Sequence, residues 1–317
     1  MLAGMVDVDL DAALLWLAAL ELAGTAVFGL ALGLDGLLRR RSAAVRRGLW
    51  ALAMAVALIL PLTRLALPAP SVALVPGLAA ALLGVWIIGA AGLLARLGVG
   101  VVQARRMRAA SVPLVDAGWR ASLAGLQEGG RPAVELRVCD ASRAPVVVGV
   151  RRAAVLVPRE LLAIAATGRR SLLAHELAHV ARGDVVLLQA GALVRAIYWV
   201  CPLAWWALRR LRARAEDAAD DAVLQAGVPS SSYAAQLVAV ARAQLERAGR
   251  VAAGGLRARV GAVLDVRRVR GSARVRRWGL PRLVGAALML ATMVTACEAR
   301  SGEPRAAMLT AGDQRTP

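Results

Sequence analysis

Residues 171–184 read SLLAHELAHVARGD, a segment in which two histidines stand four residues apart. We expect a helix over 171–182. Because side chains four positions apart lie one above the other on a helix, His175 and His179 would share one face. Glu176 follows the first histidine, and the chain has 2 histidines among its 317 residues. The segment therefore predicts a helix that presents two imidazoles with a carboxylate beside them.

This pair of histidines has the spacing of metal ligands. Two imidazoles one helical turn apart fit two corners of a tetrahedral zinc site. Zinc lowers the pKa of a bound water molecule to about 7, and Glu176 is placed to take its proton. The alternative is a surface helix whose histidines bind nothing, because HExxH also occurs by chance. Since both histidines of the chain fall at this spacing, we interpret them as ligands of one Zn²⁺ ion.

A catalytic zinc usually has a third protein ligand and an open position. The cysteines form no CxxC pair, and the best candidate is Glu216, on a helix expected over 209–226. Asp220 lies one turn later, where a carboxylate can hydrogen-bond the free nitrogen of a ligand histidine. The alternative is a solvated acidic face that pairs with neighbouring arginines. That face would contain Glu216, Asp217, Asp220 and Asp221, with Arg212 and Arg214 as partners.

A zinc peptidase also needs a hydrogen-bond donor beside the metal to stabilise the oxyanion of its intermediate. The two tyrosines of the chain, Tyr198 and Tyr233, are the candidate donors. Nothing in the sequence selects one of them, and packing is the alternative role for each.

Long apolar runs indicate a membrane protein. Hydrophobic residues make up 59% of the chain, against roughly 45–50% in soluble domains. Runs of about 20 residues can cross a bilayer, and we expect three transmembrane helices within residues 1–104, with a shorter fourth candidate at 283–297. The three runs cover 12–34, 48–67 and 77–104.

The arginines orient these spans. The loop 39–47 holds five arginines, whereas the loop around 68–76 holds none. Basic loops stay in the cytoplasm, so we place the first loop and the Arg-rich region 105–282 there. The tail 298–317 would be extracytoplasmic and too short for a folded domain. The apolar stretch 185–208 is ambiguous, and we interpret it as a helix broken near Pro202, either buried in the domain or lying on the membrane.

Short β-branched segments precede the histidine helix. Residues 133–138 alternate apolar and polar side chains, and 145–150 and 153–157 are rich in valine. Such runs bounded by turn residues are typical of strands, and we expect a small antiparallel sheet. The fold class is therefore a mainly α membrane protein, in which transmembrane helices carry a cytoplasmic, zincin-like α+β metallopeptidase domain.

Four motifs in this order resemble the BlaR/MecR family of integral-membrane metallopeptidases, the signal transducers of β-lactam resistance. They are APVVVGVRRAAVLVPREL (144–161), HELAHVARGD (175–184), IYWVCPLAWWALRR (197–210) and AEDAADDAVLQAG (215–227). The resemblance implies that Glu216 is the third zinc ligand and that Asp220 supports a ligand histidine. Cys201 stands where that family usually has Asn, and Ala219 where it usually has Cys.

The resemblance also implies a function and a location. We expect a multi-pass protein of the bacterial inner membrane, a zinc endopeptidase that cleaves a cytoplasmic regulator such as a transcriptional repressor, or its own chain. For self-cleavage, 242–277 is the candidate region, since its arginines and small residues lack a core pattern. The penicillin-binding sensor domain of the best-known members is not expected, because few residues follow 297.

Other classes of protein fit less well. Membrane zinc proteases of the heat-shock and prenyl-protein type share HExxH and a later ExxxD, but the RxD after the zinc helix favours the BlaR/MecR type. A non-catalytic signalling protein with structural zinc would need four ligands. A transporter is disfavoured by the long Arg-rich region. Aromatic residues make up only 3% of the chain, so the net charge of +19 does not indicate direct nucleic-acid binding.

Overall fold

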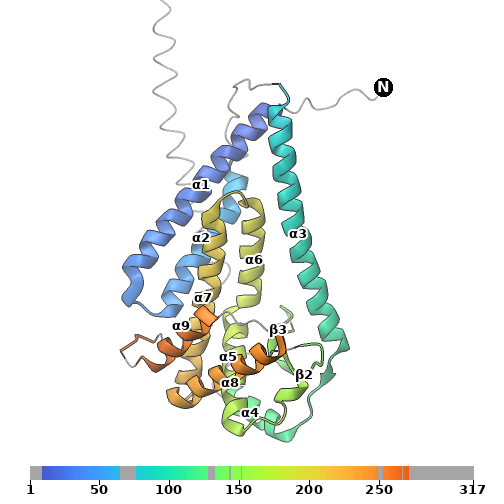
Figure 1. Ribbon diagram of the computed structural model, residues 1–317, viewed down its shortest axis with the longest axis vertical. Coiled ribbons are helices and arrows are strands. Elements are labelled where there is room, and N and C mark those ends of the chain that lie inside the picture. Colours follow the sequence, from blue (N-terminus) through green and yellow to red (C-terminus); the bar gives the residue numbers. More distant parts are fainter. Residues whose placement is uncertain are drawn as a thin grey trace, which may run out of the picture.

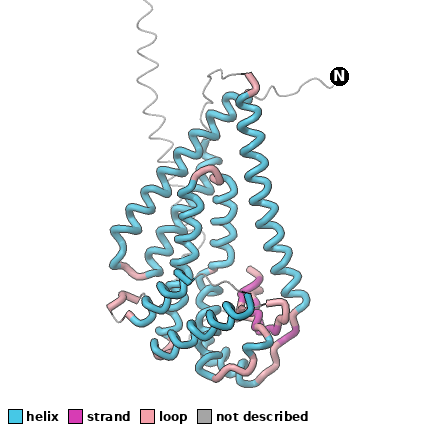
Figure 2. The backbone as a smooth tube through the Cα atoms, in the orientation of Figure 1, coloured by secondary structure: helices cyan, strands magenta, loops and turns pink. Residues whose placement is uncertain are grey.

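The structure is a computed structural model and is mostly helical (Figures 1 and 2). It describes residues 9–64, 76–127, 133–142, 144–150, 152–248, 253–265 and 267–270. Within these residues, three helices are long and apolar enough to cross a membrane. They are α1 (Leu10–Leu37), α2 (Ala43–Arg64) and α3 (Leu78–Ala110), and they correspond to the three expected spans. The expected fourth span at 283–297 and the tail 298–317 lie outside the described residues.

The helices α1 and α2 pack side by side, whereas α3 diverges from them and descends to the sheet (Figure 1). Large apolar side chains such as Trp50, Met54 and Phe28 are buried between α1, α2 and their neighbours. By contrast, α3 carries outward-facing aliphatic residues, of which Ile88 is 74% exposed. An apolar surface of this kind suits the hydrocarbon core of a bilayer.

The ambiguous stretch 185–208 forms most of a helical hairpin that packs into this bundle. Helix α6 (Asp184–Ile197) runs along α2 and α3, and α7 (Pro202–Gln225) returns along α1 and α2. The core that contains Leu20 and Trp50 also contains Val194 and Leu208 of the hairpin. Of the two alternatives for this segment, the structure therefore supports burial, and it places the segment inside the helical bundle.

The sequence explains the break in this hairpin. As expected, the helix breaks near Pro202, because proline fixes φ at a helical value and suits the first turn of a helix. The chain reverses through Tyr198–Cys201, and Pro202 starts α7. Helix α7 therefore begins earlier than the helix expected over 209–226. Because the chain enters and leaves at the same end of the bundle, the arginines after residue 208 need not cross a membrane.

The sheet is mixed, not antiparallel as expected. Its strand order is β1-β2-β4-β3, with β2 parallel to β4 and the other two pairs antiparallel. Strand β4 is entirely apolar and fully buried, so it takes a central position between β2 and the edge strand β3. The strands are β1 (Val112–Pro113), β2 (Glu135–Val138), β3 (Val146–Val148) and β4 (Ala154–Val157).

A second core lies below the bundle, between the sheet and four more helices (Figure 1). It buries Trp119, Leu173 and Val263, among others. The helices are α4 (Ala117–Gln127), α5 (Ala166–Arg182), α8 (Ser230–Ala248) and α9 (Ala253–Leu264). The region 242–277, expected to lack a core pattern, thus contains the end of α8 and all of α9.

Candidate metal centre

Helix α5 carries the predicted histidine pair, and a single glycine ends it. Gly183 adopts a left-handed conformation (φ 64°), and its N–H donates to the carbonyl groups of His179 and Val180. Glycine reaches this conformation without a steric cost and commonly terminates helices. Helix α6 starts at the next residue, at an angle of 60° to α5. This sharp turn brings Asp184 back to His179.

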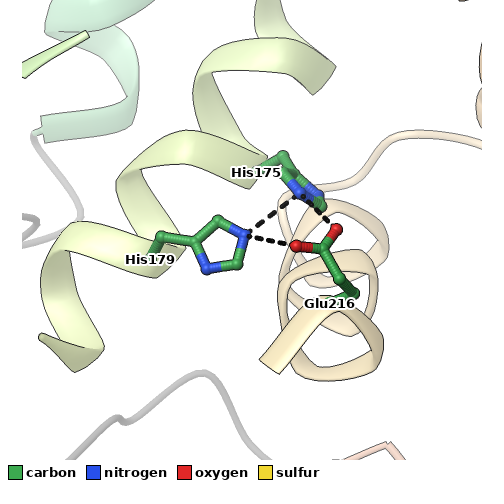
Figure 3. A group of neighbouring side chains, drawn as sticks. All are labelled: His175, His179 and Glu216. Atoms are coloured by element: carbon green, nitrogen blue, oxygen red, sulfur yellow. Dashed lines mark hydrogen bonds and ion pairs between the residues drawn. The ribbon is translucent and has the colours of Figure 1, made fainter. Parts of the chain in front are cut away.

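His175, His179 and Glu216 point toward one another from two helices, α5 and α7 (Figure 3). The Nε2 atoms of the two histidines lie 3.2 Å apart. Glu216 Oε2 is 3.5 Å from His175 Nε2, and Oε1 is 3.6 Å from His179 Nε2. Within the described residues, these three side chains form the group whose spacing could hold a metal ion.

Each histidine has a carboxylate on the side away from this cluster. His179 Nδ1 lies 2.7 Å from Asp184 Oδ2, and His175 Nδ1 lies 3.2 Å from Asp220 Oδ1. A carboxylate that accepts a hydrogen bond from Nδ1–H keeps the proton on that nitrogen and so leaves the Nε2 lone pair free for a metal. Both imidazoles therefore present their ligating atom to the same point.

Two further side chains hold Asp220. Arg259 of α9 donates from Nε and Nη2 to the two oxygens of Asp220, at 2.8 and 2.7 Å. The Tyr233 hydroxyl donates to Asp220 Oδ1 at 2.7 Å and lies 3.1 Å from His175 Nδ1. Arg259 Nη1 also lies 3.2 Å from Glu216 Oε2. Helices α8 and α9 thus fix the orientation of the carboxylates on α7.

Burial and these hydrogen bonds shift the pKa values of the cluster. Burial disfavours charge on His175, but its bonds to Asp220 and Glu216 outweigh this effect and raise its pKa to about 9. Burial likewise disfavours ionisation of Glu216 and Asp184, but their histidine partners and nearby arginines lower both pKa values to about 2. The carboxylates are therefore ionised at neutral pH, whereas His175 would release its Nε2 proton when it binds a metal.

A cavity of about 590 Å³ opens onto the cluster, and Glu176 lines it together with both histidines. Burial raises the pKa of the Glu176 carboxyl group. The walls are mainly apolar and include Val146 and Val147 of the edge strand β3 and Leu237 of α8. The cavity thus presents mainly apolar walls beside the histidine pair.

The acidic residues of α7 divide between two roles. Glu216 and Asp220 face the histidines, whereas Asp217 Oδ2 pairs with Arg214 Nη1 at 2.8 Å. Asp221 Oδ1 lies 3.6 Å from Arg268 Nε. The expected solvated acidic face is therefore wrong: Asp217 pairs with Arg214 as expected, but Asp221 is buried and its nearest arginine is Arg268.

The structure separates the two candidate oxyanion donors. Tyr233 lines the cavity, but its hydroxyl is engaged by Asp220. Tyr198 lies in the core of the helical bundle, where its hydroxyl donates to the carbonyl of Ala57 at 2.8 Å. Tyr198 is therefore a packing residue of the hairpin and does not join the cluster.

Sequence reasoning missed three residues of this centre. Asp184 was noted as part of a motif, without its contact to His179. Arg259 was missed because nothing in an Arg-rich segment marks the arginine that faces Asp220. Arg47 of α2, which donates to Asp184 Oδ1 at 2.7 Å, was counted only among the arginines that orient the spans.

Comparisons with known proteins cover this region of the chain. Residues 65–260 match the family described as BlaR1 peptidase M56. The chain is also 29% identical over 83 residues to the regulatory protein BlaR1 of Bacillus licheniformis. That match covers 26% of this chain and 14% of the relative, so it spans only a small part of the longer protein.

Proposed function

Since the chain belongs to the BlaR1 peptidase M56 family, a family of metallopeptidases, and has three helices long and apolar enough to cross a membrane among its described residues, we propose that it is a membrane-embedded zinc endopeptidase. The observation that carries this proposal is the spacing of the three donor atoms. Zinc bonds of about 2.0–2.1 Å at tetrahedral angles place ligand atoms roughly 3.3 Å apart. The separations of 3.2, 3.5 and 3.6 Å among His175, His179 and Glu216 fit this requirement.

The donor set also favours a catalytic site over a structural one. Structural zinc sites are closed by four protein ligands, whereas catalytic sites have three and keep one position open. Three protein donors meet here at the wall of a cavity, and Glu176 lines the same cavity. This arrangement favours hydrolysis over a non-catalytic role for the metal.

In the proposed mechanism, His175, His179 and Glu216 would hold zinc, which supplies Lewis acidity and lowers the pKa of an attacking water. Glu176 takes a proton from that water and later delivers it to the leaving amine, which is general base and then general acid catalysis. Asp184 and Asp220 keep the imidazoles in the tautomer that ligation needs. The apolar walls of the cavity exclude bulk water from the reaction.

The proposed substrate is an extended protein segment. Strand β3 is at the edge of the sheet and lines the cavity, so a substrate can add to it as a further strand. Following the arginine distribution, we place this site on the cytoplasmic side of a bacterial inner membrane. The proposed substrate is then a cytoplasmic regulator of the repressor type, or the chain itself.

The test measures bound metal and peptide hydrolysis on the same purified protein in detergent. Glu176→Gln should retain zinc and lose activity by about 10²–10⁴-fold, the usual contribution of a general base. Glu216→Ala should lose zinc. Asp217→Ala is the matched control, because Asp217 is on the same turn but pairs with Arg214.

Two results would overturn the proposal. If Glu176→Gln cleaves a panel of quenched fluorescent peptides as fast as the unmodified chain, Glu176 is not the base. If Glu216→Ala binds zinc as tightly as Asp217→Ala, the assignment of the third ligand is wrong.

A further inference from the structure

Arg47 connects the transmembrane helix α2 to the predicted metal site. Its Nε donates to Asp184 Oδ1 at 2.7 Å, and its Nη2 donates to the carbonyl of Arg182 at 3.0 Å. Arg182 is the last residue of α5, whose terminal carbonyl groups have no partner within the helix. A cation at this end also matches the helix dipole. Arg47 thus contacts both the end of the histidine helix and the start of α6.

The two oxygens of Asp184 have different partners. Oδ1 accepts from Arg47, whereas Oδ2 lies 2.7 Å from His179 Nδ1 and accepts from Arg182 Nη2 at 3.0 Å. The side chain of Asp184 is only 2% exposed, and that of Arg47 is 11% exposed. Water therefore has little access to replace a lost partner. A continuous set of hydrogen bonds runs from α2 through one carboxylate to His179.

We infer that Arg47 is a positioning residue for the metal site: it acts through Asp184 to fix the ring orientation of His179. This inference rests on the proposed function, because it assigns His179 to a metal. Through the contact between Arg47 and Asp184, the geometry of the site depends on the position of α2 relative to α5 and α6. A displacement of α2 would remove Arg47 from Oδ1, so that Arg182 alone would hold the Asp184 carboxylate and the ring of His179 would be oriented less firmly toward Glu216.

The neighbouring residue provides a matched control. Arg46 Nε donates to Asp35 Oδ1 at 2.7 Å, and Asp35 keeps Arg214 at 3.6 Å as a second partner. Asp184 likewise keeps Arg182 if Arg47 is lost. The two arginines therefore make similar buried ion pairs at the same end of α2, but only the pair of Arg47 reaches a histidine of the metal site.

The experiment uses the full chain in detergent, loaded with Co²⁺ in place of zinc, because tetrahedral Co²⁺ absorbs visible light in a way that reports its ligand geometry. Loss of a residue that supports a metal-ligating histidine through hydrogen bonds typically weakens metal binding by 10- to 100-fold. We expect Arg47→Gln to weaken Co²⁺ affinity by roughly tenfold and to alter the spectrum. Arg46→Gln should leave both unchanged, and Arg47→Lys should recover part of the affinity.

A double-mutant cycle tests the route through Asp184. Asp184→Asn should cause a similar loss of affinity, and adding Arg47→Gln to it should cause little further loss, because residues that act through each other are not additive. Additive losses, or equal effects of Arg46→Gln and Arg47→Gln, would overturn the inference.

If the unmodified chain and His179→Ala bind Co²⁺ equally, the proposed function itself fails. If Arg47→Gln does not fold, the Co²⁺ affinity and spectrum of Arg47→Lys and Asp184→Asn are compared with those of Arg46→Gln instead.

Discussion

The ring of Tyr198 packs directly on the backbone of Gly24, so the tip of the α6–α7 hairpin rests on α1. A Cβ added at Gly24 would overlap Cδ1 and Cε1 of that ring. The ring cannot withdraw without loss of the bond from its hydroxyl to Ala57 on α2. Glycine at position 24 therefore allows the hairpin to sit between the two helices.

We predict that Gly24→Ala destabilises the protein by about 1–3 kcal/mol, the usual cost of forcing an extra methyl group into a packed core. Gly29→Ala is the control in the same helix, because a Cβ there would meet no atom within 4 Å. It should be neutral or slightly stabilising, since alanine favours helices. Thermal unfolding in detergent measures the difference, and equal melting temperatures for the two variants would contradict the contact.

Asp221 should make stability depend on pH. Burial raises its pKa to about 6, and Asp217 adds to this effect. Between pH 4 and 6 the unfolded chain releases this proton while the folded chain keeps it, so stability falls as pH rises through this range. The two-unit difference between the folded and unfolded pKa corresponds to about 3 kcal/mol in the free energy of unfolding. Screening by solvent reduces this contribution to about 1–2 kcal/mol.

The variant Asp221→Asn cannot ionise, so it isolates this effect. It should unfold at a higher temperature than the unmodified chain at pH 7.5, and the difference should vanish near pH 4. Melting curves over this pH range provide the measurement. A constant difference at every pH would show that the substitution acts through packing and not through ionisation.

Tyr233 should affect metal affinity more than catalysis. Its hydroxyl is engaged by Asp220, which in turn contacts His175. We expect Tyr233→Phe to weaken zinc binding several-fold, with hydrolysis per bound zinc changed by only a few-fold. Loss of an oxyanion donor would instead lower kcat by about 10²–10³-fold at full zinc occupancy. Ser232→Ala, a change at an exposed neighbour, is the control.

Local signals in the sequence were sufficient to place the histidine pair on one helix and to locate the three long apolar helices. Helical periodicity predicts that His175 and His179 share one face of a helix. Long apolar runs can likewise be recognised in the sequence without knowledge of the tertiary structure. The parallel pairing of β2 with β4 could not be predicted in this way. It depends on β4 entering between β2 and β3, a long-range arrangement that a four-residue strand does not encode.

The partners of the histidines were harder to predict for a related reason. Arg47 is one of five arginines in 39–47, and Arg259 lies in a segment with many others. Which of them meets a carboxylate depends on how α2 and α9 pack against α5 and α7. Composition shows that basic residues are abundant, but only the packed structure shows which ones contact the site.

Removal of the metal should loosen the contact between α5 and α7, because the proposed ligands come from both helices. A ligand that binds only the folded state stabilises it by about 2.7 kcal/mol at 100 times its Kd. We therefore expect a chelator to lower the melting temperature and added zinc to restore it. Glu176→Gln should show the same response, since Glu176 is assigned to proton transfer and not to ligation. In Glu216→Ala, chelator and zinc should hardly change the melting temperature. If they change it as much as in the unmodified chain, the zinc is bound elsewhere.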